Sequence, residues 1–187
     1  MVPGLPGSKG GKVYSIMEFV DGYTLKTFTR RWGPLPLSVC IAIGIQVCEA
    51  LTFIHETSSK PLIHCDLKLS NIMVTRDGQV KLIDFGVAWP VGEEWVRAAS
   101  VYGTPAYMAP EQIMQQAPTP TTDLFSLGAV LYELYNGRRL FPEKNVLKLV
   151  NERIESWRNP YATVEFAPTA SKFYDAIVRR CTASYPA

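Results

Sequence analysis

The sequence predicts an α+β domain that is mainly α-helical, and three features support this fold class. Residues 36–55 repeat apolar or small side chains at intervals of three and four, as a helix with one buried face does. Asp77-Gly78 separates two short apolar runs and favours a tight β-hairpin. Residues 123–135 are apolar around nearly the whole helical circumference, which predicts a helix inside the core.

The amino-terminal part divides into a tail and a strand. Proline and glycine occupy six of the first eleven positions, so residues 1–11 are expected to form a flexible tail. Residues 12–20 contain side chains suited to a pleated sheet and end at Asp21-Gly22, which predicts one extended strand. Residues 12–187 are then expected to form the folded domain.

The long helix over 36–55 begins at Pro36, a residue that suits a first helical turn. Its buried stripe is predicted at positions 37, 41, 44, 45, 48, 51, 52 and 55. The hairpin that follows is expected to pair residues 72–74 with residues 80–83 across the Asp-Gly turn. A long helix therefore precedes two short strands.

The second half of the chain is predicted to be mainly helical. Residues 119–122 offer caps for the core helix over 123–135, and Gly137 is placed to end it. Apolar residues at helical spacing predict two further amphipathic helices, one through residues 147–157 and one through residues 173–180.

Composition excludes several classes of function. Nineteen Lys and Arg against seventeen Asp and Glu give a net charge of +2, so no strong basic field indicates nucleic-acid binding. No apolar run approaches the ~20 residues of a membrane span, and no secretory signal is visible, so a cytoplasmic chain is expected. The four cysteines have neither zinc-ligand spacing nor a disulfide framework and are expected to be free thiols.

Two short segments carry the residues of a phosphoryl-transfer site. His64-Cys65-Asp66-Leu67-Lys68-Leu69-Ser70-Asn71 precedes the predicted hairpin, and Asp84-Phe85-Gly86 follows it. Phosphoryl transfer needs a carboxylate to orient the attacking hydroxyl, a cation against the phosphate oxygens, and oxygen ligands for Mg²⁺. Asp66, Lys68, Asn71 and Asp84 supply these groups. Each could also be a turn residue, but their joint spacing favours the catalytic interpretation.

These segments resemble the protein kinase family, in its Hanks-type serine/threonine branch. The first is similar to the family's catalytic loop and the second to its metal-binding Asp-Phe-Gly motif. Gly103-Thr104-Pro105-Ala106-Tyr107-Met108-Ala109-Pro110-Glu111 resembles the end of its activation segment, and Met17-Glu18-Phe19-Val20 stands at its hinge position. The resemblance implies a truncated kinase domain: residues 12–22 as the last strand of the smaller lobe plus the hinge, and residues 23–187 as the larger, C-terminal lobe.

The resemblance also implies roles for individual residues. Asp66 would orient the substrate hydroxyl and accept its proton, Lys68 would contact the γ-phosphate of ATP, and Asn71 and Asp84 would hold Mg²⁺. Thr104 would steady the loop through Asp66 and Lys68, a pattern of serine/threonine kinases, so the implied partners are ATP and a protein with a Ser or Thr acceptor.

The implied adenine site lies at the hinge. The backbone of Glu18 and Val20 would hydrogen-bond adenine, Met17 would guard the back pocket, and Met73 would lie beneath the ring. His64 is expected to pack against the Asp-Phe-Gly phenylalanine, His55 to be a structural histidine, and Asp123 to cap its helix and tie down the catalytic loop.

The sequence departs from the family pattern in two places. Cys65 replaces the arginine that pairs with a phosphorylated activation segment, so regulation of that kind is not expected. The residues before Lys12 supply no glycine-rich lid and no phosphate-binding strand lysine, so weak turnover is expected from this chain.

An exposed apolar patch at Met17, Phe19, Met73 and Phe85, prone to self-association, is a further expectation. The alternative function is a catalytically impaired, kinase-like protein-binding module. A small-molecule phosphotransferase of the aminoglycoside-modifying kind shares the loop Asp and Asn but lacks Thr104 and the Ala-Pro-Glu segment.

Overall fold

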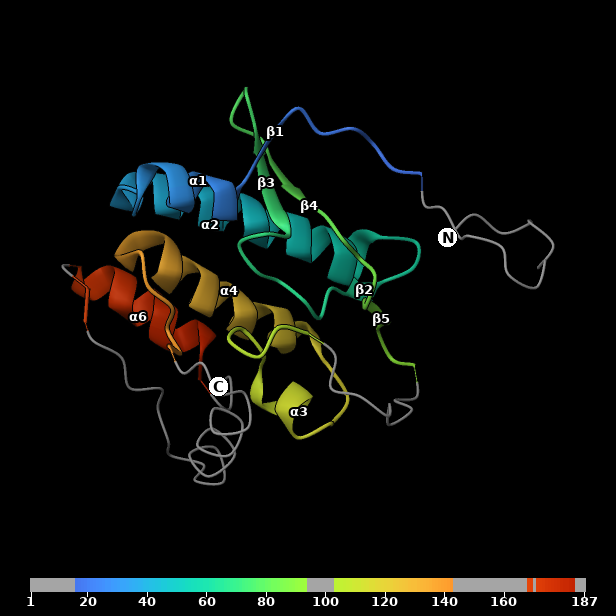
Figure 1. Ribbon diagram of the computed structural model, residues 1–187. Helices are drawn as coiled ribbons and strands as arrows, with labels where there is room; N and C mark the ends of the chain where they lie inside the picture. Colours follow the sequence, from blue (N-terminus) through green and yellow to red (C-terminus); the bar gives the residue numbers. More distant parts are fainter. Residues whose placement is uncertain (1–15, 94–102, 143–167, 170, 184–187) are drawn as a thin grey trace, which may run out of the picture.

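The computed structural model describes residues 16–93, 103–142, 168–169 and 171–183 of the chain. Figure 1 shows helices stacked beneath a small sheet, with α2, α4 and α6 running side by side. The helices are α1 (Leu25–Trp32), α2 (Leu37–Thr52), the π-helical turn η1 (Phe53–Thr57), α3 (Pro110–Ile113), α4 (Pro120–Asn136) and α6 (Lys172–Cys181).

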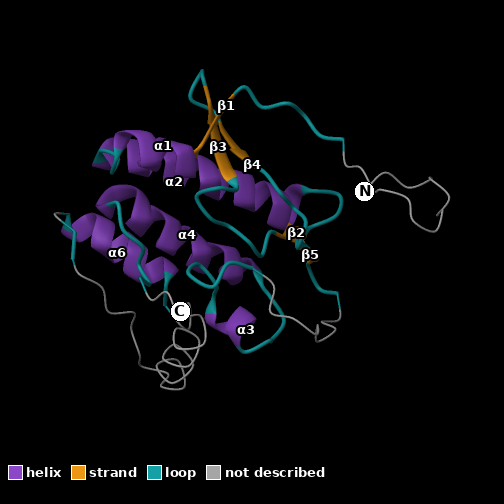
Figure 2. Cartoon of the chain, viewed as in Figure 1, coloured by secondary structure: helices purple, strands orange, loops and turns teal. Residues whose placement is uncertain are grey.

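Within the described ranges, the strands form two small antiparallel sheets (Figure 2). The larger sheet has the order β1-β3-β4, from β1 (Gly22–Thr24), β3 (Ile72–Thr75) and β4 (Val80–Leu82). The smaller sheet pairs β2 (Leu62–Ile63) with β5 (Trp89–Pro90). A mixed fold of helices with small sheets agrees with the predicted α+β class.

The hairpin β3–β4 is confirmed, and its register sets the position of the residues around it. Met73 lies opposite Lys81 and Ile72 opposite Leu82. Of the predicted Asp-Gly pair, only Gly78 adopts a left-handed conformation, with φ of 83°. Thr75 closes the turn because its hydroxyl accepts the Gln79 N–H at 3.0 Å.

Helix α4 is the centre of the core, as its apolar composition predicts. Its side chains are buried over most of its length, and it packs against both α2 and α6. It begins three residues before the predicted start, because Thr119 is the N-cap and Pro120 is the first helical residue. Gly137 ends it in the left-handed conformation, as predicted.

The predicted buried stripe of α2 is partly wrong. Cys40, Ile43, Val47 and Leu51 face the core, with Gly44 between them, whereas the predicted positions Ile45, Cys48 and Thr52 are exposed. The exposed row lines an apolar groove of about 590 Å³ between α2, α4 and α6. Apolar residues of α2 therefore lie both on the face that packs in the core and along this groove. The periodicity of the sequence alone does not distinguish these two faces.

The continuous helix Leu37–Thr57 is also long and apolar enough to cross a membrane by length and composition. Within the fold, the residues on one of its faces belong to the hydrophobic core beside α4. A core helix of a folded domain passes the same test of length and composition.

The strand predicted over 12–20 is wrong where the structure describes it. Residues 16–21 have no regular structure, and Ile16 and Phe19 are about 90% exposed. A strand needs a neighbour to pair its backbone, and among the described residues the pairing with β3 begins only at Gly22. Residues 1–15 lie outside the described residues, as does the helix predicted through 147–157. The helix predicted through 173–180 is confirmed as α6.

Gly128 sets the distance between α4 and α6. A β-carbon at this position would lie 2.7 Å from Cys181 Cβ and from Thr182 Cγ2. We expect Gly128→Ala to lower the free energy of unfolding by about 1–2 kcal/mol, because overpacking exceeds the gain in helix propensity. Thermal unfolding followed by circular dichroism measures this.

Gly44→Ala is the matched control for this prediction, since Gly44 is also a helical glycine. Its added β-carbon would meet the movable end of Leu131 at 3.2 Å. We expect no loss of stability in Gly44→Ala. A Gly128→Ala protein as stable as the wild type would contradict the packing role of Gly128.

Candidate active site

Four of the predicted site residues form one hydrogen-bonded cluster. The Lys68 ammonium donates to Asp66 Oδ2 at 2.5 Å and to Thr104 Oγ1 at 3.0 Å. The Thr104 hydroxyl donates in turn to Asp66 Oδ1 at 2.9 Å. Asn71 Nδ2 lies 3.0 Å from the Asp66 carbonyl oxygen and 3.2 Å from Asp66 Oδ2. The Asp66 carboxylate is therefore held on several sides.

This cluster remains open to an incoming molecule. The side chains of Lys68 and Asp66 are 22% and 12% exposed, so both reach the surface. The Thr104 hydroxyl accepts a hydrogen bond from the Lys68 ammonium and donates one to the Asp66 carboxylate, which a single hydroxyl group can do at the same time. A fixed carboxylate beside a fixed ammonium can orient a hydroxyl group and stabilise negative charge next to it.

The backbone before Asp66 is strained and is held by a buried carboxylate. Cys65 has a φ of 64°, a conformation that a cysteine rarely adopts. The fully buried Asp123 accepts the Cys65 N–H at 2.9 Å and the His64 N–H at 2.8 Å. On the other side, Gln112 Nε2 donates to the Cys65 carbonyl at 2.7 Å. The predicted tie between Asp123 and the catalytic loop is present.

Asp123 ties down the loop but is not a helix cap. It is the fourth residue of α4, whose cap is Thr119. Its remaining partner is His55, whose Nε2 donates to Asp123 Oδ2 at 2.8 Å. His55 is therefore a structural histidine, as the sequence predicts, and it couples η1 to α4 and the loop.

His64 packs as predicted and is fully committed to structural contacts. Its ring lies 4.8 Å from that of Phe85, centroid to centroid. Its Nε2 donates to the Ile83 carbonyl at 3.1 Å, and its Nδ1 accepts the Asp66 N–H at 3.4 Å. These contacts join the catalytic loop to the Asp-Phe-Gly segment.

Cys65 is a buried structural thiol. Burial, with the nearby charge of Asp123, raises the pKa of Cys65 to about 12. The thiol therefore stays protonated at neutral pH, and the reactive form of a cysteine is the thiolate. No cationic side chain stands at this position of the loop.

Asn71 and Asp84 lie at the same end of the hairpin. The pairing of Ile72 with Leu82 places Asn71 beside Ile83, whose N–H donates to the Asn71 carbonyl at 2.9 Å. Asp84 follows directly, with an exposed side chain and a left-handed φ of 65°, which an aspartate tolerates.

The donor set at this end suits magnesium. Within the described residues the Asp84 carboxylate makes no hydrogen bond or ion pair, so its oxygens are open to a cation. No group of three or more His, Cys, Asp or Glu gathers in the described part of the chain. Mg²⁺ is usually held by one or two carboxylates together with substrate phosphates, rather than by a full protein cage. Asp84 and the Asn71 amide fit that pattern.

The predicted adenine-binding residues are not part of the hydrogen-bonded cluster, and three of the four lie outside the helices and strands. Met17, Glu18 and Val20 belong to segment 16–21, which has no regular structure, and Met17 is 69% exposed. Glu18 is tied to β4, with Lys81 Nζ 3.4 Å from its carboxylate. Met73 is half-buried on β3, directly opposite Lys81. Their nucleotide-binding roles stay predictions.

Sequence reasoning missed the polar side chains that hold the segment following Thr104. Ser126 on α4 donates to the Tyr107 carbonyl at 2.8 Å, and the Tyr107 hydroxyl donates to Glu133 Oε2 at 2.6 Å. Gln112 Oε1 also accepts a hydrogen bond from the Ala109 N–H at 3.0 Å. The signal available in the sequence was that Ser126 and Glu133 are polar residues on the otherwise apolar helix α4. Buried polar groups need hydrogen-bond partners, so such residues indicate contacts with another segment.

We expect Asp123→Asn to lower the free energy of unfolding by about 1–3 kcal/mol. An asparagine has one acceptor oxygen for the N–H groups of His64, Cys65 and His55, so a buried donor loses its partner. Denaturant unfolding measures the loss.

Asp175→Asn is the matched control, since Asp175 is also a buried helical carboxylate. Both of its oxygens share the single N–H of Thr169, which an asparagine oxygen can still accept. We expect a smaller loss there. Equal losses in the two variants would show that Asp123 has no special role.

Comparison with known proteins identifies the family. The family model of the protein kinase domain matches residues 8–186. The serine/threonine-protein kinase PknB of Mycobacterium leprae is 32% identical over 181 residues, 96% of this chain and 28% of that protein. A probable serine/threonine-protein kinase of Corynebacterium efficiens is 34% identical over 179 residues, 93% of this chain and 27% of that protein.

A probable serine/threonine-protein kinase of Clostridium perfringens is 42% identical over 125 residues, which are 66% of this chain and 18% of that protein. The chain thus spans less than a third of the length of these relatives. The family model covers nearly all of the chain, including both predicted motif segments. The chain therefore belongs to the Hanks-type serine/threonine protein kinase family.

Proposed function

We propose that this chain transfers the γ-phosphoryl group of ATP to Ser or Thr hydroxyl groups of proteins, with Mg²⁺ as cofactor. The observation that carries the proposal is the Thr104 hydroxyl, which links Lys68 and Asp66 in one hydrogen-bonded cluster. The relatives named above are serine/threonine kinases, which favours this acceptor class. A cytoplasmic location is part of the same proposal.

Each residue has a defined role in this reaction. Asp66 orients the attacking hydroxyl and accepts its proton, while Lys68 stabilises the negative charge on the transferred group. Thr104 and Asn71 fix the Asp66 carboxylate, so that no reorganisation is needed as charge develops. Mg²⁺, held by Asn71 and Asp84, would neutralise phosphate oxygens.

We assign the helical body, residues 23–187, to the larger lobe of a kinase, and residues 12–22 to the hinge and its strand. Weak turnover belongs to this proposal, because no described lysine other than Lys68 lies in the cluster to contact a second phosphate. Loss of one preorganised donor costs roughly 10² to 10³ in rate.

The proposal is tested with labelled ATP and a Ser/Thr peptide mixture of varied sequence. We expect Asp66→Asn to reduce phosphate incorporation at least about 100-fold, because it removes the proton acceptor. Asp77→Asn is the matched control: Asp77 is an exposed turn residue, and Asn-Gly suits a hairpin equally well. Equal incorporation by the wild type and Asp66→Asn would refute catalysis and favour the kinase-like binding module.

We also propose self-association through an apolar patch made of the exposed Met17, Phe19 and Phe85 with the half-buried Met73. Phe19 is 88% exposed and Phe85 40%, and burial of such groups favours association. We expect Phe19→Ser to shift the protein towards monomer in sedimentation velocity. Phe173→Ser on α6, where the side chain is 67% exposed, is the control and should leave the distribution unchanged. A wild-type monomer at all concentrations would contradict self-association.

A further inference from the structure

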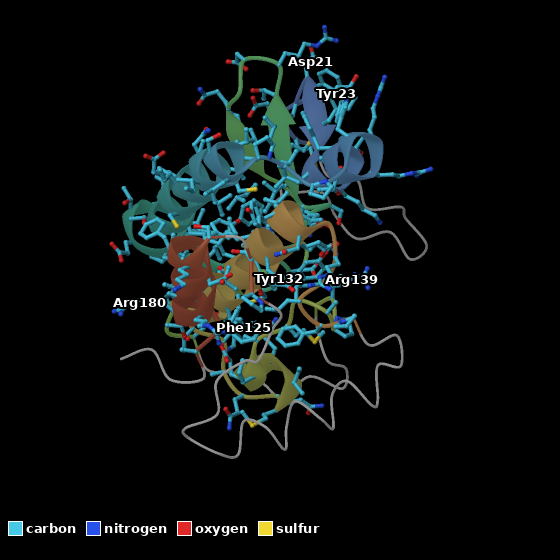
Figure 3. The ribbon with its side chains drawn as sticks, turned by 90° about the vertical axis from the view of Figure 1, so that its left-hand side faces the viewer. Asp21, Tyr23, Phe125, Tyr132, Arg139 and Arg180 are labelled. Carbon is cyan, nitrogen blue, oxygen red and sulfur yellow. The ribbon has the colours of Figure 1, made fainter. Side chains whose placement is uncertain are left out.

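A second cavity, of about 430 Å³, adjoins the catalytic cluster. It lies between α1, the catalytic loop and the end of α4, and both Lys68 and Thr104 contribute to its wall. Arg139, just beyond α4, stands below α1 on this side of the molecule in Figure 3. A group that fills the cavity is therefore a near neighbour of Asp66.

The walls of this cavity are fixed by the backbone. The Lys26 N–H donates to the Leu69 carbonyl at 2.9 Å, which joins α1 to the catalytic loop. The Leu35 N–H donates to the Leu134 carbonyl at 2.9 Å, which joins the turn after α1 to α4. A pocket with walls held in this way is preformed and loses little entropy on binding.

The charge of the lining is mainly positive. The lining contains one carboxylate among its described residues, that of Glu133, and four cations: Lys26, Arg30, Lys68 and Arg139. Glu133 already accepts the Tyr107 hydroxyl at 2.6 Å, and Lys68 is paired with Asp66. No salt bridge among the described residues involves Lys26 or Arg30. The cavity thus has a surplus of cations.

Helix-end electrostatics explain only part of this pattern. Arg30 and Arg31 both lie in the last turn of α1, where positive charges interact favourably with the helix dipole. The Arg31 guanidinium, however, lies over the Trp32 ring at 5.1 Å from its centroid and does not line the cavity. Arg30 lines the cavity instead, beside Lys26 one turn earlier on the same face.

We propose that this cavity binds an anionic side chain, a carboxylate or a phosphorylated residue, of the peptide whose hydroxyl meets Asp66. The chain then selects Ser/Thr sites with acidic neighbours. An extended peptide advances about 3.3 Å per residue, so the anionic residue lies within a few positions of the acceptor. This inference rests on the proposed function for its acceptor, but binding can be measured without turnover.

The test uses fluorescein-labelled peptides in which alanine replaces the acceptor. Four series carry neutral, aspartate, phosphoserine or lysine residues, placed before or after the central alanine, and binding is followed by anisotropy. We expect the aspartate peptides to bind about three- to tenfold tighter than the neutral ones, as two exposed ion pairs allow. The preference should weaken with added salt, because these charges are exposed.

Phosphoserine distinguishes the two anionic groups. Arginine binds phosphate in a bidentate manner, so tighter binding of phosphoserine than of aspartate would identify a phosphate subsite. The reverse order, or equal affinity, would identify a carboxylate subsite. Lysine peptides should bind more weakly than neutral ones.

Paired variants assign the effect to the cavity. We expect Arg30→Gln and Arg139→Gln each to reduce the ratio of aspartate to neutral affinity about two- to fivefold. The controls Arg31→Gln and Arg138→Gln remove the same charge from adjacent residues outside the lining, and should leave the ratio unchanged. Equal effects in the cavity variants and the control variants would show that the preference for acidic peptides comes from net charge alone, and would overturn the inference.

Two further outcomes separate this inference from the proposed function. Phosphorylation of Ser/Thr peptides without preference for acidic ones would overturn the cavity assignment and leave the kinase activity standing. Selective binding of acidic peptides without phosphate transfer would refute the activity and keep the binding site. No binding of any peptide at millimolar concentration would overturn the cavity assignment.

Discussion

A buried carboxylate, that of Asp123, is the constraint on which the candidate site depends. It is fully buried and accepts N–H groups from His55, His64 and Cys65. A charge in this position is tolerated only because its oxygens are hydrogen-bonded. The same bonds hold Cys65 in a left-handed conformation and so determine where the chain presents Asp66. The packing of the core and the geometry of the candidate site therefore depend on the same buried carboxylate.

Helix α4 connects that constraint to the rest of the fold. Asp123, Ser126 and Glu133 contact the loop, the Tyr107 carbonyl and the Tyr107 hydroxyl in turn. The spacing of three and seven residues puts these side chains on one helical face. The opposite side packs against α6, where Tyr174 donates to the Leu131 carbonyl at 2.8 Å. One helix thus supports the core and both segments that form the candidate site.

The sequence predicted what depends on local pattern. Helices α2, α4 and α6 and the β3–β4 hairpin follow from periodicity and turn residues, and the cluster of Asp66, Lys68, Asn71 and Thr104 follows from the family motifs. Helix α1 was missed, although Thr24 caps its start and Arg30 and Arg31 lie in its last turn. Its apolar residues Leu25, Phe28 and Trp32 stand at helical spacing on one face, so a periodic signal was present in the sequence, although it extends over only eight residues.

The remaining differences arise from contacts between distant residues. Strands β2 and β5 have two residues each and exist only because they pair with one another. Residues 16–20 have the composition of a strand, but the first described backbone bond to the sheet is at Asp21, whose carbonyl accepts the Arg76 N–H at 3.3 Å. The exposed row of α2 is apolar because it lines a groove rather than the core. None of these outcomes is set by residues close in sequence.

The distribution of cations around the loop gives the site its electrostatic character. Cys65, whose pKa is raised by burial, contributes no charge beside Asp66, and Lys68 is neutralised by the carboxylate it contacts. Positive charge near the cluster therefore comes from Lys26 and Arg30 on α1 and from Arg139, three residues after α4, which line the same cavity as Thr104. Because field strength falls with distance and with salt, an anion gains most by entering that cavity. The fold that fixes the Asp66 carboxylate thus also fixes the side on which the anionic group of the proposed peptide would bind.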